Sequence, residues 1–385
     1  MVVIKTMKEM KKIIITGLLA VALVACTKES TTGPGAGGNE ISLEITPTVA
    51  QTSQEEAIET RARVSGTSFS LGDRVGLFIA GSNVPASIYD NILALRGGAG
   101  WGYYLNGLYN GTVLSGFSDW NTITLHGYYP YDANVTNLNS IPFRIADETS
   151  PGSGEAVATE EEVSVDYMVA GTKTKDMSTS APTDYLTLEF HHLMTAIDIN
   201  LTKPYQGPNL LLDRAVLEIG AVGGGGGGTR SLSINGTYSA NNSGIPNLSA
   251  ELTAATSVKK LTMNYTSTNK IVSHNGNRRS PLLIMPELRH NVTPGLEDAE
   301  VTITLYFTET NGDPYVFEDI DSDGSGNPQI KFNLSDIANA ADDDGLLAGK
   351  VYLINASVGT YVKFTGSFWI VSDPIEDDGE QKIEI

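Results

Sequence analysis

The sequence contains one cysteine, Cys26, and a thiol is a group that can be oxidised or acylated. A single cysteine cannot form a disulfide within the chain, and a buried cysteine serves mainly as a small apolar side chain. The neighbours of Cys26 indicate another use. A lysine-rich stretch is followed by an uncharged run from Ile13 to Ala25, which is shorter than the roughly 20 residues that a membrane-spanning helix needs. This order is typical of a secretory signal peptide.

The run before the cysteine ends in Leu23-Val24-Ala25-Cys26, which resembles the lipobox of bacterial lipoproteins. The resemblance implies that residues 1–25 are a lipoprotein signal peptide and that the thiol of Cys26 is lipidated, for example with palmitate. Residues 26–39 are mostly small and polar, so we expect a flexible tether. No later stretch approaches about 18 consecutive apolar residues, which leaves lipid on Cys26 as the expected membrane attachment.

Two other patterns imitate chemical sites. His191 and His192 look like a metal pair, but neighbouring residues in a strand point to opposite faces and cannot bind one ion. We expect one of them to pack or to form a hydrogen bond. The run Gly223 to Gly228 contains a phosphate-loop pattern, but a strand and turn follow it instead of a helix, so we interpret it as a flexible loop.

The segment DIDSDGSGNPQI at 319–330 resembles the start of a calcium loop, with aspartates at alternate positions and a glycine at the turn. Its twelfth position is Ile330 where such a loop has a glutamate, and no helices are expected around it. A solvated turn has the same composition, as does DDDG at 342–345. We therefore predict no metal site, and calcium binding by residues 319–330 stays an open alternative.

The remaining composition argues against catalysis and against nucleic acid. The sequence has neither HExxH nor GxSxG, and its five histidines show no spacing that suggests a catalytic relay. The formal net charge is −20, so a phosphate backbone would be repelled. We expect a protein that is not an enzyme, that has no cofactor and that does not bind nucleic acid.

The elements that carry these residues are predicted to be β-strands. Apolar and polar residues alternate in several stretches that are bounded by Gly, Asn, Asp and Pro, and no long amphipathic helix is evident. The clearest alternating positions are Ile41, Leu43 and Ile45; Val301, Ile303, Leu305 and Phe307; and Val362, Phe364, Phe368 and Ile370. At most two helical turns are expected, at 334–341. The sequence thus predicts an all-β protein made of antiparallel sheets.

The body after the tether is long enough for two β-sandwich domains. We place the first at 40–205 and the second at 206–385, because a cluster of Pro, Gly and Asn lies at 203–209. A break near Ala181-Pro182 is an alternative boundary.

The stretch RARVSGTSFSLGDRVGLFI (61–79) contains an arginine, a Ser/Thr segment, an aromatic residue, Gly-Asp and a hydrophobic strand. This order resembles the opening signature of the fimbrillins, the lipoprotein pilin subunits of Bacteroidales. Later landmarks follow in the family's order: HGYYPYD (126–132), VDYMVAG (165–171), LEFHHLMTAIDINLT (188–202), LLIMPE (282–287) and GKVYLINASV (349–358). The hexaglycine run and the acidic tail depart from the family pattern, which leaves a stalk, anchor or tip role open.

The resemblance implies two transthyretin-like antiparallel β-sandwiches in tandem, and a fimbrial subunit (pilin) that supports cell adhesion. It implies a surface-exposed location on the cell outer membrane and in the fimbrium. The implied partners are other fimbrial subunits, in a homopolymer or heteropolymer, and ligands on host or bacterial surfaces. The implied assembly mechanism is strand exchange.

The sequence contains the parts that strand exchange requires. Residues 40–49 form a first strand, and Arg61 and Arg63 follow it in a polar, acidic segment where a trypsin-like protease would find exposed chain. Cleavage at either arginine would separate the lipidated strand from the body and expose a groove that another strand can fill. The stretch from Ile370 to Ile385, with alternating Ile383 and Ile385, is a possible donor. In the alternative interpretation, 40–49 is an ordinary edge strand and the arginines are solvated.

A second function stays open from the sequence: an outer-membrane-anchored lipoprotein that binds glycans or host ligands without polymerising. Such a protein would present aromatic platforms. Trp101, in what the glycines around it indicate is a loop, is the best candidate, while Trp120 and Trp369 are scattered. Burial is the commoner fate of an aromatic side chain.

Overall fold

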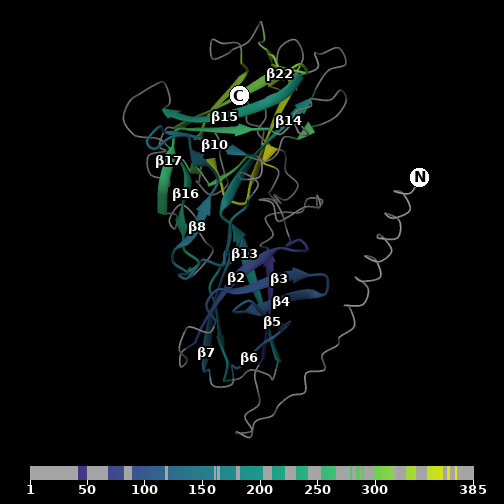
Figure 1. Ribbon diagram of the computed structural model, residues 1–385, viewed down its shortest axis with the longest axis vertical. Helices are drawn as coiled ribbons and strands as arrows, with labels where there is room; N and C mark the ends of the chain where they lie inside the picture. The colour runs from purple at the N-terminus through teal and green to yellow at the C-terminus, as the bar shows by residue number, and fades with distance from the viewer. Residues whose placement is uncertain are drawn as a thin grey trace, which may run out of the picture. The chain divides into compact units, whose positions relative to one another are not determined.

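The computed structural model describes residues 42–49, 68–81, 89–117, 120–159, 162, 165–178, 183–202, 210–221, 231–241, 253–265, 278–279, 283–286, 288–289, 299–315, 317, 327–334, 345–358, 362–364 and 369–370. All of them lie in the unit Glu40–Ile385. Strands dominate these residues, and none of them forms an α-helix (Figure 1). The prediction of an all-β protein is confirmed.

The first sheet has ten described strands. They are β1 (Ser42–Val49), β2 (Arg74–Gly81), β3 (Ile92–Gly97), β4 (Gly100–Leu105), β5 (Leu108–Gly111), β6 (Leu114–Ser115), β7 (Thr122–Tyr129), β11 (Met168–Ala170), β12 (Lys173–Asp176) and β13 (Thr183–His192). Their order across the sheet is β5-β4-β3-β2-β7-β11-β13-β1-β6, and β12 also pairs with β7. The first described strand, β1, therefore pairs with β13, the strand of this sheet that comes last in the chain.

The other described strands form four sheets. The largest contains β9 (Asp147–Glu148), β10 (Glu155–Thr159), β15 (Leu210–Ala221), β18 (Lys260–Asn264), β22 (Ala299–Glu309), β23 (Pro314–Tyr315) and β24 (Gln329–Asn333). The next contains β14 (Met194–Thr202), β19 (Arg278–Arg279), β20 (Leu283–Pro286), β26 (Val351–Val358), β27 (Val362–Phe364) and β28 (Trp369–Ile370). Two small sheets contain β8 (Ile141–Arg144), β16 (Leu232–Tyr238) and β17 (Thr253–Val258), and β21 (Leu288–Arg289) and β25 (Gly345–Leu346).

Two clusters of buried apolar side chains hold these sheets together. The first core takes its residues from Leu43 to Phe190, on β1 to β4, β6, β7, β11 and β13 and on the loops that carry Phe69, Tyr89, Phe117, Trp120 and Met177. The second core takes most of its residues from Leu193 to Ala356, together with the earlier segment from Val135 to Ala158, which carries β8 and β10. The chain thus contributes residues to the second core, returns to the first sheet for β11 to β13, and contributes to the second core again from Leu193 onward. The predicted domain boundary falls in 203–209, outside the described residues, and stays a prediction.

The alternation seen in the sequence matches burial. On β22, the side chains of Val301, Ile303, Leu305 and Phe307 are all buried, because successive side chains of a strand point to opposite faces. Residues 362–364 and 369–370 are strands as expected. Of the short helix expected at 334–341, only Leu334 is described.

Three strand pairs are parallel: β1 with β13, β10 with β18, and β14 with β26. The other described pairs are antiparallel, as the sequence predicts. A parallel pair needs a long connection between its strands, so no local turn signal marks it in the sequence.

Candidate functional site

The first strand, β1, occupies a slot that the rest of the first sheet builds. It pairs in parallel with β13 along its whole length, from Ser42 opposite Thr183 to Val49 opposite Phe190. Its other edge pairs with β6 only at Ser42 and Leu43. Beyond Leu43, no described strand pairs with this second edge. The strand is thus an interior strand at one end and an edge strand at the other.

The side chains of β1 alternate between the core and the outer face. Leu43 and Ile45 are fully buried in the first core and Val49 is nearly so, whereas Glu44 is half-buried and Thr46 is exposed. Burying an aliphatic side chain of this size contributes about 1.5–3 kcal/mol. The slot therefore has positions for aliphatic residues at every second place of whichever strand fills it.

The free edge of β1 is closed by a side chain instead of a strand. The backbone N–H of Ile45 donates a hydrogen bond of 2.9 Å to the hydroxyl of Tyr103, and this hydroxyl donates in turn to the carbonyl oxygen of Ile45. We call this arrangement, one hydroxyl bound to the N–H and the C=O of one residue, a tyrosine clasp. Burial raises the pKa of Tyr103 well above its ordinary value of 10.0, so the hydroxyl keeps the proton that it donates.

Two residues after Ile45, the same edge carries Pro47, which has no N–H to leave unpaired. The clasp and the proline together satisfy or remove backbone groups that an open edge would offer to another chain.

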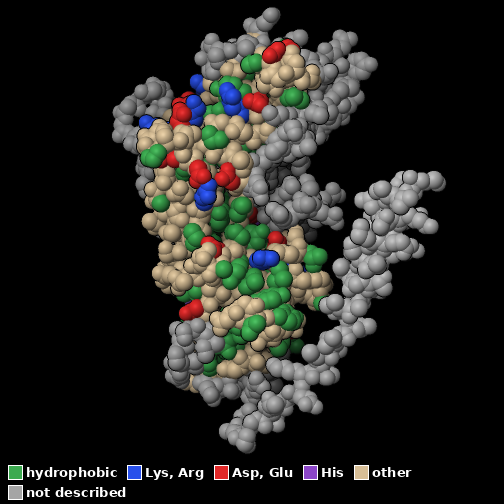
Figure 2. Space-filling view, in the orientation of Figure 1, with side chains coloured by type: hydrophobic (Ala, Val, Ile, Leu, Met, Phe, Trp, Pro, Cys, Tyr) green, Lys and Arg blue, Asp and Glu red, His purple; other side chains and the backbone are tan. Residues whose placement is uncertain are grey.

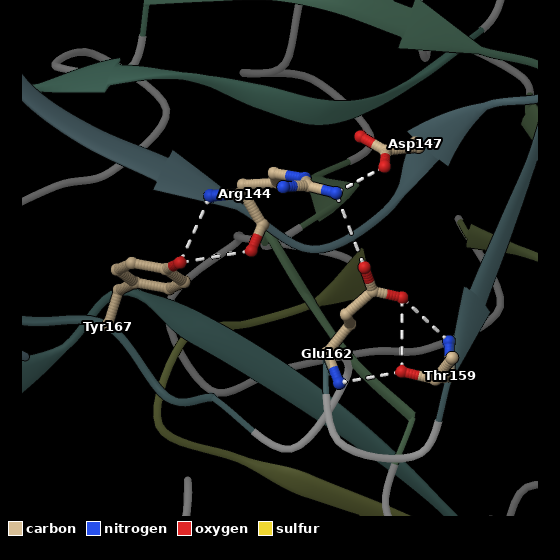
Figure 3. Close-up of polar contacts among 5 residues, drawn as sticks. All are labelled: Arg144, Asp147, Thr159, Glu162 and Tyr167. Carbon is tan, nitrogen blue, oxygen red and sulfur yellow. Dashed lines mark hydrogen bonds and ion pairs between the residues drawn. The ribbon is translucent and has the colours of Figure 1, made fainter.

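The same clasp occurs at β8. The hydroxyl of Tyr167 accepts a 3.0 Å hydrogen bond from the N–H of Arg144 and donates a 3.0 Å hydrogen bond to the carbonyl oxygen of Arg144 (Figure 3). The guanidinium of Arg144 extends the other way, to the carboxylates of Asp147 and Glu162, and Glu162 in turn accepts a 2.9 Å hydrogen bond from the N–H of Thr159 (Figure 3). Among the described residues, tyrosine clasps thus hold the backbone of two strands, at Ile45 of β1 and at Arg144 of β8.

A cavity of about 270 Å³ lies beside the free edge of β1. Residues 44–49 form one wall, and the other wall includes Ser68, Phe69, Arg96 and Trp101. The ring of Phe69 packs against three other aromatic rings. The distances between ring centroids are 5.3 Å to Trp101, 5.6 Å to Tyr129 and 5.3 Å to Phe190. Figure 2 shows that hydrophobic side chains gather over the part of the sheet that carries β3, β4 and β5.

The opening signature is explained by this wall. Gly72 adopts the left-handed conformation, with φ of 93°, and its N–H donates a 2.9 Å hydrogen bond to the carbonyl oxygen of Arg96. The carboxylate of Asp73 accepts a 2.6 Å hydrogen bond from the N–H of Ser70 and a 3.2 Å hydrogen bond from the hydroxyl of Tyr129. The Gly-Asp pair therefore builds the corner that holds Phe69 against the core.

The predicted lipidation site, Cys26, and the predicted cleavage sites, Arg61 and Arg63, lie outside the described residues, as do the hexaglycine run and most of the segment 319–330. Of the described residues, Val49 is the last before the two arginines and Ser68 is the first after them. Both line the cavity beside β1.

The two neighbouring histidines behave as their spacing predicts. The Nδ1 atom of His192 lies 2.6 Å from Oδ2 of Asp166, and both side chains are fully buried. His191 lies on the other face and is half-buried. Burial raises the pKa of Asp166, and its attraction to His192 lowers it. No group of three or more His, Cys, Asp and Glu side chains is arranged to hold a metal ion in the described part of the chain.

Trp101, the best candidate for an exposed aromatic platform, is buried. The residue lies on β4, in a hairpin with β3, and only 7% of it is exposed. Its loop assignment was wrong because the glycines mark the hairpin turn and not a long loop. Trp120 is buried as well.

No local signal in the sequence distinguishes Tyr103 from its neighbour Tyr104. Its partner Ile45 lies 58 residues earlier, so only the assembled sheet brings the two together.

Among the described residues, no helix is both long and apolar enough to cross a membrane.

No curated protein matches the chain. Among solved structures it is similar to two proteins described as candidate cell adhesion proteins. The one from Bacteroides uniformis has 15% identity and a TM-score of 0.45, over 84% of this chain and 96% of the other. The one from Bacteroides ovatus has 17% identity and a TM-score of 0.46, over 86% and 98%. A fimbrial assembly protein from Parabacteroides distasonis has 10% identity and a TM-score of 0.37, over 84% and 93%.

The sequence profile of the fimbrillin-like family matches residues 60–370, which includes the opening signature and all the later landmarks. The matched range begins after β1 and ends at β28. The chain therefore belongs to the fimbrillin-like family.

Proposed function

We propose that this protein is a structural subunit of a surface fimbria, that it is exported as a lipoprotein acylated on Cys26, and that it assembles by strand exchange after cleavage at Arg61 or Arg63. Membership of the fimbrillin-like family supports a pilin or adhesin role at the cell surface. The acylation of Cys26, the cleavage and the strand exchange go beyond what family membership supports.

The observation that carries the proposal is the position of β1. This strand pairs with β13 along its whole length and its Leu43 and Ile45 are fully buried, yet the chain connects it to the rest of the described body only through residues 50–67, which contain both arginines. A cut at either arginine would leave β1 attached to the body by noncovalent contacts alone. The lipidated fragment would then be able to leave as one piece.

Loss of β1 would create an acceptor groove. The departure would expose the apolar positions of Leu43, Ile45 and Val49 and the backbone groups of β13 that now pair with β1. Each aliphatic side chain contributes about 1.5–3 kcal/mol when buried, and each backbone hydrogen bond contributes about 1 kcal/mol net. A strand supplied by a second subunit would recover both terms, which is the physical basis of polymerisation by strand addition.

The partners in this proposal are other fimbrial subunits, and the outer membrane holds the unprocessed chain through its lipid. The donor is the stretch from Ile370 to Ile385, of which all but Ile370 lies outside the described residues.

The proposal is tested by electron microscopy of the purified native surface fraction together with unheated gels. The parent chain is expected to form filaments and high-mass ladders. The double variant Arg61→Ala, Arg63→Ala and a chain trimmed after Val371 are expected to form neither. Ladders that are unchanged in both variants would show that strand exchange is wrong, and a parent that never polymerises would favour a stand-alone binding protein.

A further inference from the structure

We propose that the outer face of β3, β4 and β5 binds a sugar that carries a carboxylate, with the ring of Tyr109 as the surface on which the sugar stacks and Arg74 as the cation that pairs with the carboxylate. The inference does not depend on strand exchange, because every residue that it uses lies in the folded body. It applies to a single unassembled chain, so its test and the test of polymerisation can fail independently.

The surface concerned is the face of these strands that points away from the first core. On the inner face, Ala94 of β3 and Tyr103 of β4 are fully buried in that core. Successive side chains of a strand point to opposite faces, so Leu93, Leu95 and Tyr104 lie on the outer face. All three are partly exposed, and hydrophobic side chains gather over this part of the sheet (Figure 2). Exposed apolar side chains that lie together commonly mark a binding surface.

The strand registers place the outer residues in two rows across the sheet. In one row, Arg74 of β2 lies opposite Leu95, and Leu95 lies opposite Gly102 of β4. In the next row, Tyr104 of β4 lies opposite Tyr109 of β5. Neighbouring strands are about 4.8 Å apart, so the backbones of Arg74 and Gly102 are separated by about 10 Å.

The ring of Tyr109 connects the two rows. A Cβ on Gly102 would lie 2.9 Å from Cε2 of Tyr109 and 3.6 Å from its hydroxyl oxygen, so the far end of this ring lies over the bare backbone of β4. The ring also contacts that of Tyr104, with 5.2 Å between the centroids and an angle of 54° between the planes. Tyr109 is nevertheless 61% exposed. The sheet therefore supports the ring and leaves much of it accessible to a ligand.

An accessible aromatic ring of this kind suits a sugar. The face of an aromatic ring carries partial negative charge, and the C–H groups on the face of a pyranose ring carry partial positive charge. No described residue forms a hydrogen bond with the hydroxyl of Tyr104 or Tyr109, so both hydroxyls can bind those of the sugar. Covering Gly102 explains the position of the Tyr109 ring but not the cation in the adjoining row.

The charge of this surface favours an acidic sugar. The chain has a net charge of −20, yet the segment from Arg74 to Phe117 contains two cationic residues, Arg74 and Arg96, and one acidic residue, Asp90. Arg96 follows Leu95 and so belongs to the inner face, where it lines the cavity beside β1. Arg74 is exposed, and no described residue forms an ion pair with its guanidinium. A carboxylate on a sugar stacked over Tyr109 would supply that partner, in a charge-assisted hydrogen bond.

Two methyl glycosides test the proposal. Methyl β-D-glucuronide carries a carboxylate where methyl β-D-glucoside carries a hydroxymethyl group, and the two are otherwise identical. In ligand-observed NMR titrations of the full chain, both are expected to bind, the glucuronide about fivefold or more tightly. Equal affinities would overturn the role of the charge, and a glucuronide that does not bind would overturn the proposal.

Two variants locate the site. Arg74→Gln is expected to lower the affinity for the glucuronide to that for the glucoside and to leave the glucoside unchanged. Tyr109→Ala is expected to weaken both by about fivefold or more. The matched controls are Lys173→Gln, which removes an exposed cation of β12, and Tyr185→Ala, which removes a 69% exposed tyrosine of β13. Both controls should bind as the parent does. Parental affinities in Arg74→Gln or Tyr109→Ala would overturn the assignment.

Gly102→Ala tests the position of the ring without removing it. The added methyl group would take the space that the end of the Tyr109 ring occupies, so the ring must shift and both affinities should fall. Gly98→Ala is the control, since a Cβ there meets nothing within 4 Å. Melting temperatures close to the parent's would exclude unfolding as the cause of any loss. A parent that binds neither glycoside but sediments as a dimer, with the dimer lost in Tyr109→Ala, would identify the occupant as a second copy and overturn the proposal.

Discussion

The hydroxyl of Tyr103 forms hydrogen bonds with both backbone groups of Ile45, a residue 58 positions earlier in the chain. The contact ties the first strand of the sheet to β4 without any ladder between the two strands. It occurs on the edge of β1 opposite β13, beyond the last residue that pairs with β6. The side chain of Tyr103 thus supplies the hydrogen bonds that a neighbouring strand would otherwise supply.

Removal of this hydroxyl is expected to destabilise the protein. Tyr103→Phe leaves the N–H and C=O of Ile45 buried without partners, and each such group costs about 1–3 kcal/mol. We expect the free energy of unfolding to fall by about 2–4 kcal/mol in a urea titration. The control Tyr109→Phe changes a side chain that is 61% exposed, and an effect below about 0.5 kcal/mol is expected there. Equal losses in the two variants would contradict the role assigned to the clasp.

Gly76 on β2 is expected to tolerate no side chain. A Cβ at this position would lie 1.9 Å from Cε1 of Tyr128. That ring cannot move aside easily, because it is fully buried and its hydroxyl bonds the backbone of Asp132 at 2.9 and 3.2 Å. Gly76→Ala should therefore lower the stability by about 1–3 kcal/mol or prevent folding.

The matched control is Gly98→Ala, since a Cβ there would meet nothing within 4 Å. Melting temperatures measured side by side provide the comparison. A Gly76→Ala protein that melts with the parent would mean that Tyr128 is not fixed in place.

Lowering the pH is expected to reduce the free energy of unfolding, partly through protonation of His126. Its Nδ1 atom lies 3.1 Å from the carbonyl oxygen of Ala240 and 3.1 Å from the hydroxyl oxygen of Thr172. Burial lowers the pKa of His126 below its ordinary value of 6.5, and the hydrogen bond to Ala240 opposes this shift.

The folded state thus binds a proton at His126 less readily than the unfolded state does. Its contribution to stability is fully present above pH 6.5 and is lost as the pH falls below that value. Burial shifts the pKa of His191 in the same direction, and the raised pKa of Asp166 acts in the opposite one. The test is therefore a difference: the stability of His126→Asn should fall less between pH 7 and pH 5 than that of the parent. Parallel pH curves would contradict the assignment.

Replacement of Cys26 by alanine is expected to release the protein from the membrane fraction. An acyl chain contributes about 0.8 kcal/mol for each buried methylene, and under the proposed function this acyl chain provides the membrane attachment. Cell fractionation followed by immunoblotting measures the release, with Cys26→Ser as a second variant that keeps the size of the side chain. Retention of both variants at the parent's level would exclude the lipoprotein proposal.

Local patterns predicted the strands but not their partners. The alternation of Leu43 and Ile45 predicted a strand with these side chains buried, because side-chain direction follows from residue spacing alone. Its partner is β13, which lies far along the chain in a parallel pair, and no turn between the two strands encodes that choice. The buried pair of His192 and Asp166 shows the same division. The sequence predicted that one histidine would pack or form a hydrogen bond, and only the tertiary fold determines that the partner of His192 is the carboxylate of Asp166.

The candidate site was predictable only in part, for the same reason. The sequence identified the first strand. Tyr103 gave no signal, because a clasp depends on where a hydroxyl lies after the sheet has formed. The burial of Trp101 against Phe69 likewise depends on a hairpin and a corner that meet only in the folded sheet.

Loss of β1 from the assembled subunit is tested most directly by N-terminal sequencing of subunits recovered from the high-mass ladder after it is dissociated by heat. We predict that these subunits begin at Ala62 or Val64, directly after one of the two arginines, and that the lipidated fragment with residues 42–49 is absent from the ladder. The unassembled chain in the same cells should begin at Cys26 and serves as the control. Assembled subunits that begin at Cys26 and still carry Leu43 and Ile45 would contradict the replacement of β1.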